Sequence, residues 1–77
     1  MRKSAHDSSY IALIEWLVTA RERQGLSVRE LAHLIDEPHS VVVKTELRSR
    51  KLSILEYHQY CKALNLDPAE GLSILDE

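Results

Sequence analysis

The stretch LSVRELAHLIDEPHSVVVKTELRSRK, residues 26–51, decides the fold of this 77-residue chain. Ser27 and Glu30 have the Ser-x-x-Glu spacing of a capping box, which opens a helix of about eight residues. Asp36-Glu37-Pro38 ends this helix, because proline cannot continue a helix but can begin the next one. We therefore predict a helix, a tight turn and another helix over 39–47, followed by a short basic segment.

Helices are also predicted on both sides of this stretch. Asp7 or Ser8 can cap a helix that ends near Arg23, where Gly25 supplies the C-cap position. A fourth helix covers 54–64, with Asn65 able to take the left-handed cap conformation, and a last short helix covers 68–75. No segment alternates like a strand over a useful length, so the sequence predicts an all-α fold.

Helical spacing predicts which side chains face the core. The predicted core positions are Tyr10, Leu13, Ile14, Leu17 and Ala20 on the first helix, Val42 on the third, and Ile54, Tyr57, Tyr60, Cys61 and Leu64 on the fourth.

Length and composition predict one domain, residues 1–77. Residues 1–7 are polar and expected to be flexible, and residues 68–77 to form a short helix with an acidic tail. Cys61 is the only cysteine, and no histidine pairs with it at zinc-finger spacing, so we expect neither a metal nor a cofactor. Glu15 interrupts the apolar run 11–20, which is too short to span a bilayer. We expect a cytoplasmic, nucleoid-associated protein with no membrane partner.

Charge is unevenly distributed along the chain. The formal net charge is −2, which argues weakly against nucleic acid as a partner. However, residues 44–51 hold four cations and one anion, whereas the chain after Asn65 holds four anions and no cation. The sequence therefore indicates a polarised molecule with a basic middle and an acidic end.

The first helix has more apolar surface than one core stripe needs. Ile11, Ala12, Trp16 and Val18 lie off the predicted buried face. They indicate either a partly exposed aliphatic helix or a second buried seam against another copy of the chain, with Trp16 as an aromatic anchor. A short domain without disulfides is often stabilised by a partner subunit, which fits the second alternative.

Several segments, in order and spacing, resemble the lambda-repressor-like (Cro/XRE) helix-turn-helix family. The matching segments, which span about residues 13–75, are Ala20-Arg21-Glu22-Arg23-Gln24-Gly25-Leu26-Ser27, Glu30-Leu31-Ala32, Pro38-His39-Ser40, Val42-x-Lys44-x-Glu46, Arg50-Lys51-Leu52-Ser53-Ile54-Leu55-Glu56-Tyr57 and Lys62-Ala63-Leu64-Asn65-Leu66-Asp67-Pro68. The resemblance implies a compact five-helix domain in which the second and third helices form the helix-turn-helix. It also implies that the third helix lies in the DNA major groove.

The resemblance also implies roles for individual residues. The base-contacting candidates are His39, Ser40, Val43 and Lys44, with Val41 able to touch a thymine methyl. The phosphate-contacting candidates are Arg29, Arg48, Arg50 and Lys51. Arg21 and Glu46 match a structural ion pair of the family. Independently of the resemblance, apolar residues of the first and last helices form the candidate dimer interface, which comprises Trp16, Ile11, Leu72, Ile74 and Leu75.

Some positions depart from the family pattern. Val28 stands where glutamine often contacts phosphate, Asp36 and Arg48 stand where glycine is usual, and Val43 replaces a small or polar residue. Val41 and Val43 thus put apolar side chains where polar, base-contacting residues are usual.

The sequence predicts a small sequence-specific DNA-binding transcriptional regulator. We expect a repressor and autoregulator, of the kind found on mobile elements, that binds double-stranded DNA at an inverted repeat as a homodimer. No Ser/His/Asp or Cys/His arrangement and no glycine-rich phosphate loop is present, so we expect no enzymatic activity. The alternative is a protein-interaction module, antiactivator or antitoxin-like, that has lost DNA readout; the valines and the net charge favour it, whereas the basic run disfavours it.

Overall fold

The computed structural model describes residues 7–76, which form five helices and no strand. The helices are α1 (Ser8–Arg23), α2 (Val28–Leu34), α3 (His39–Glu46), α4 (Ile54–Leu64) and α5 (Pro68–Ile74). The predicted all-α, five-helix fold is confirmed. The predicted flexibility of residues 1–7 lies outside the described residues, apart from Asp7.

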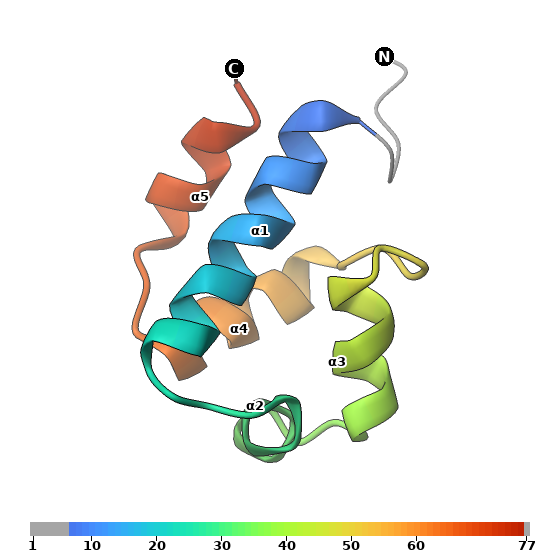
Figure 1. The fold of residues 1–77 in the computed structure, drawn as a ribbon. Coiled ribbons are helices and arrows are strands. Elements are labelled where there is room, and N and C mark those ends of the chain that lie inside the picture. Colours follow the sequence, from blue (N-terminus) through green and yellow to red (C-terminus); the bar gives the residue numbers. More distant parts are fainter. Residues whose placement is uncertain (1–6, 77) are drawn as a thin grey trace.

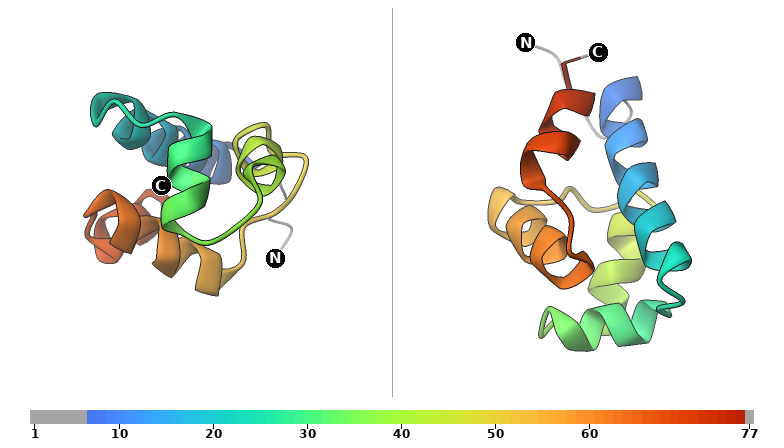
Figure 2. Two further views of the ribbon diagram at one scale, coloured as in Figure 1. Left: turned by 90° about the horizontal axis from the view of Figure 1, so that it is seen from below. Right: turned by 90° about the vertical axis from the view of Figure 1, so that its left-hand side faces the viewer.

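The helices are arranged around α1, which contacts α3, α4 and α5. In Figure 1, α5 lies alongside α1, α3 stands on the opposite side, and α2 crosses the lower end. The second view of Figure 2 shows that α2 is at the end of the molecule away from the start of α1 and the end of α5. The helix-turn-helix pair, α2 and α3, therefore occupies one corner of the molecule.

Local hydrogen bonds fix most helix boundaries. Both bonds of the predicted Ser27–Glu30 capping box are present, and Asn65 takes the predicted left-handed conformation with φ 59°. Ser53 and Glu56 form a second capping box at the start of α4. The sequence reading overlooked this box, although its Ser-x-x-Glu spacing is equally plain.

One core lies among α1, α2, α3 and α4. Its buried apolar residues are Leu13, Ile14, Leu17, Leu31, Ala32, Ile35, Val42, Tyr57, Tyr60, Cys61 and Leu64. The predicted stripes are confirmed with one clear exception. The prediction that Ile54 is buried is wrong, because its side chain is 81% exposed. Ile54 is the first residue of α4, and the buried part of that helix begins one turn later, at Tyr57. Tyr10 and Ala20 are half-buried at the edge of the core.

Gly71 allows α5 to pack closely against α1 and α4. A Cβ atom at this position would lie 2.2 Å from the Tyr57 hydroxyl and 2.5 Å from Trp16 Cζ3. The hydroxyl cannot move freely, because it donates a hydrogen bond to the Pro68 carbonyl. The Trp16 ring is thus half-buried against α5 of its own chain.

We predict that Gly71→Ala lowers the free energy of unfolding by about 1–3 kcal/mol, because Tyr57 and Trp16 must both shift. Alanine in place of a helical glycine would otherwise stabilise by about 1 kcal/mol. Urea denaturation measures the difference. Ser73→Ala, an exposed change on the same helix, is the control and should stay within about 0.5 kcal/mol of the parent protein. Equal or greater stability of Gly71→Ala would contradict this packing.

Candidate nucleic-acid interface

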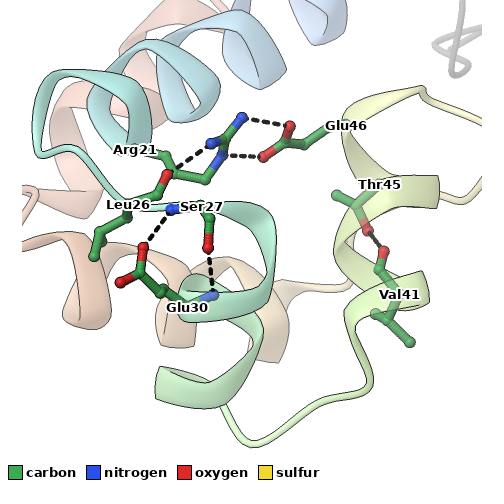
Figure 3. Close-up of polar contacts among 7 residues, drawn as sticks. All are labelled: Arg21, Leu26, Ser27, Glu30, Val41, Thr45 and Glu46. Carbon is green, nitrogen blue, oxygen red and sulfur yellow. Dashed lines mark hydrogen bonds and ion pairs between the residues drawn. The ribbon is translucent and has the colours of Figure 1, made fainter.

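The Arg21 guanidinium joins α1, the link after it and α3 (Figure 3). Its Nε and NH2 groups donate to the Glu46 carboxylate at 2.7 and 3.0 Å, and its NH1 group donates to the Leu26 carbonyl at 2.8 Å. The Arg21 and Glu46 side chains are only 11% and 16% exposed. The ion pair that the family resemblance implied is therefore present. The hydrogen bonds to Glu46 raise the pKa of Arg21, so this pair stays charged.

The turn between α2 and α3 contains a residue in a costly conformation. Asp36 has φ 57°, in the left-handed region that few residues other than glycine visit. Its conformation lets the Glu37 N–H reach the Ala32 carbonyl at 3.0 Å and closes the end of α2. Asp36 thus makes the turn that glycine usually makes in the family.

The inner and outer faces of α3 are clearly separated. Val42 and Thr45 are buried, and the Thr45 hydroxyl donates to the Val41 carbonyl at 2.8 Å (Figure 3). The outer face holds the predicted base-contacting residues. His39, Ser40 and Lys44 are exposed, and Val41 and Val43 are half-buried.

Leu47 belongs to this outer face, and the sequence reading did not select it. It directly follows α3 in right-handed helical conformation, and 69% of it is exposed. Its N–H bonds the Val43 carbonyl at 3.0 Å, so the helical spacing continues through it. The spacing 40, 44, 47 would have identified it, because residues four and seven apart share one helix face.

The predicted phosphate-contacting cations differ in their surroundings. Arg29 and Lys51 are exposed, and Arg48 is half-exposed. Within the described residues, none of these three forms an ion pair. Arg50, in contrast, donates NH1 and NH2 to Glu56 at 3.0 and 2.6 Å. Its charge is therefore already matched by a carboxylate of the same chain.

Glu56 links the basic segment to α4. Besides pairing with Arg50, it accepts the Ser53 backbone N–H at 2.9 Å as part of the capping box. The hydrogen bonds from Arg50, followed by those from Ser53, lower the pKa of Glu56 to about 2. This pair therefore fixes where the segment after α3 joins α4.

Arg48 occupies a left-handed position at the end of α3. Its φ is 63°, and its N–H donates to the Thr45 carbonyl at 3.1 Å. Holding a residue with a Cβ atom in this region costs about 1–2 kcal/mol, which glycine would avoid.

The predicted dimer-interface residues are not equally available. Leu72 is 46% exposed, whereas Ile11 is half-buried and Trp16, Ile74 and Leu75 are half-buried against the core. The sequence reading missed two exposed apolar residues on α4, Ile54 at 81% and Leu55 at 63%. Ile54 contributes to an apolar groove whose other lining residues are Tyr10, Leu13, Leu52, Ser53, Tyr57, Leu72 and Leu75.

Residues 7–76 contain no group of three or more His, Cys, Asp or Glu side chains placed to hold a metal ion. None of the described helices has the length and apolar character needed to cross a membrane.

Five helices surround one core, a tight turn joins α2 to α3, and the outer face of α3 is exposed. These features define a helix-turn-helix domain. A solved structure described as an XRE-family like protein, from Pseudomonas syringae pv. tomato str. DC3000, has the same fold with a TM-score of 0.84. It shares 37% sequence identity with this chain over 92% of this chain and 87% of its own. The chain therefore belongs to the XRE family, and the predicted family resemblance is confirmed. No model of a known protein family and no curated protein matches the chain. The fold and the family support a helix-turn-helix DNA-binding regulator.

We predict that the Arg50–Glu56 pair makes stability fall at acid pH. Because the folded-state pKa of Glu56 is about 2 and lies below the ordinary value of 4.5, its contribution is complete above pH 4.5 and is lost as pH falls toward 2. At pH 6, Glu56→Gln should lose about 1–3 kcal/mol of unfolding free energy. Urea denaturation between pH 6 and 2.5 should show the parent protein and this variant converging. A constant difference across that range would contradict the assignment.

Proposed function

We propose that this protein is a non-enzymatic transcriptional regulator that inserts α3 into the DNA major groove. The hydrogen bonds of Arg21 to Glu46 and Leu26 are the main support for the proposal. It fixes α3 from its inner side through Glu46, and it leaves His39, Ser40 and Lys44 exposed on the outer side. A helix held in this way is preorganised for the groove, which admits one α-helix.

Arg48 supports a phosphate-binding role for the segment after α3. The chain holds an arginine in a backbone conformation that would be less costly with glycine. A side chain kept at such a cost is best explained by what the side chain does, and a guanidinium beside a major-groove helix suits a phosphate. Lys51 and Arg29 are the other proposed phosphate contacts. For Arg50 we propose a positioning role, because Glu56 already neutralises its charge.

We further propose that the protein binds as a dimer to an inverted repeat, with the half-sites about 34–36 Å apart. A second copy is the partner that suits the apolar groove to which Ile54 contributes. Its lining contains no charged side chain, so two copies can bury it without leaving a charge unpaired. Ile54 itself lines this groove and is 81% exposed, so its side chain is available for a second copy to cover. Bound at a promoter, such a dimer would repress transcription by blocking polymerase. It would act on the nucleoid in the cytoplasm. The concentration of the protein itself would set the degree of repression.

One observation favours a second candidate function, a protein-interaction module. The exposed Leu47 and the neighbouring Val43 put apolar surface on the outer face of α3. A partner protein would bind with a weak dependence on salt, whereas phosphate contacts release counterions and give a steep one.

We expect the protein to select duplexes from a random-sequence DNA pool at low salt, and log affinity for them to fall steeply with log salt. Lys51→Ala should reduce that slope by about 0.9 per subunit. Arg50→Ala, the matched control, should change the slope little, because Glu56 already pairs with its cation. Failure to select any duplex would refute DNA binding and favour the protein-interaction module.

The substitution of Arg48 by glycine should affect the stability of the fold and the affinity for DNA in opposite directions. Arg48→Gly should raise the free energy of unfolding by about 1 kcal/mol, because glycine relieves the left-handed strain, and it should weaken DNA binding by removing a cation. Arg48→Ala should weaken binding equally without the gain in stability. Thermal unfolding and DNA titration measure the two effects. If Arg48→Gly bound DNA as tightly as the parent protein, Arg48 would have no phosphate contact.

We predict that Ile54→Glu shifts the dimer to monomer at micromolar concentration, as measured by sedimentation. A carboxylate in the first turn suits the helix dipole, so the monomer should remain folded. Leu34→Glu, at a leucine that is 55% exposed on α2, is the control and should leave the dimer intact. A parent protein that is monomeric at these concentrations would remove the dimer from the proposal.

A further inference from the structure

The outer face of α3 has an apolar side chain at its C-terminal end. Leu47 lies one turn beyond Val43 and two turns beyond Ser40, with Lys44 on the same face. With 69% of Leu47 exposed, the fold itself does not use this side chain. Leu47 lies in the sequence between two cations, Lys44 and Arg48. A polar residue at this position would add more to phosphate affinity than a leucine does.

The exposed apolar part of the α3 outer face is small for a protein interface. A stable protein interface buries about 800 Å² on each partner. Here a single well-exposed leucine and a half-buried valine are bordered by His39, Ser40 and Lys44. Such a small apolar stripe matches a ligand with small isolated apolar groups set among polar ones.

The major groove of DNA presents one such group, the C5 methyl of thymine. Leucine and valine can neither donate to nor accept from a base edge, so a methyl is the only feature of the base edges with which they can make a favourable contact. We infer that Leu47 reads a thymine methyl within each half-site. This inference rests on the proposed function, since it requires α3 to lie in the groove.

The expected effect is modest for each contact and larger for the whole site. Burying one methyl-sized apolar group changes affinity about fourfold. A dimer that reads one methyl in each half-site should then lose about fifteenfold when both methyls are absent.

The test uses duplexes that the parent protein selects from a random-sequence pool, resynthesised with deoxyuridine in place of thymidine. This change removes the methyl and keeps the base pairing. Binding by the parent protein should fall about fourfold for each methyl that is read. Leu47→Asn should bind the thymine and uracil duplexes equally, at about the weakened affinity. Leu34→Asn, an exposed leucine on α2, is the matched control and should retain the parent protein's preference for thymine.

Each other outcome is decisive. If the parent protein binds both duplexes equally, thymine reading is wrong although DNA binding stands. If Leu47→Asn keeps the preference for thymine, the methyls are sensed elsewhere and the assignment to Leu47 fails. If no duplex is selected at low salt, the proposed function fails and the inference with it.

Discussion

The contact on which the helix-turn-helix depends is the three-way hydrogen bonding of the Arg21 guanidinium. It reaches the Leu26 carbonyl before α2 and the Glu46 carboxylate at the end of α3. Because arginine is planar and always charged, a bidentate pair of this kind fixes orientation as well as distance. The partly buried setting makes the loss of either partner costly, since the other charge would remain without its counterpart. The position of α3 is thus set from α1.

This constraint explains how the chain tolerates strain at both ends of α3. Asp36 before it and Arg48 after it are both left-handed without being glycine. Strained residues persist where the surrounding structure over-determines them. Here the core holds Val42, and the Arg21 pair holds Glu46, so α3 is fixed between the two strained positions. The strain therefore costs stability without displacing the helix.

Sequence reasoning succeeded where the signal is local. The capping box at Ser27, the left-handed cap at Asn65 and the buried stripes follow from short-range spacing, and each is present. It failed for the burial of Ile54, because burial depends on which part of a helix contacts the neighbouring helices. The sequence also gave no means of pairing Arg50 with Glu56, because the geometry of the intervening loop decides whether the two side chains meet. The helix at α3 was predicted correctly, but the exposure of Leu47 required the structure.

The structure also explains why the net charge of −2 says little about the outer face. Glu46 and Glu56 are engaged by Arg21 and Arg50, and Glu30 is engaged in a helix cap. These anions therefore neutralise cations or satisfy backbone groups inside the scaffold. Among the basic residues of α2, α3 and the following segment, those without a carboxylate partner in the described chain are Arg29, Lys44, Arg48 and Lys51. Electrostatic attraction to a polyanion depends on such unpaired surface charge more than on the overall sum, because screening confines each charge to a range of about 8–10 Å. An acidic protein can thus present a basic surface to DNA.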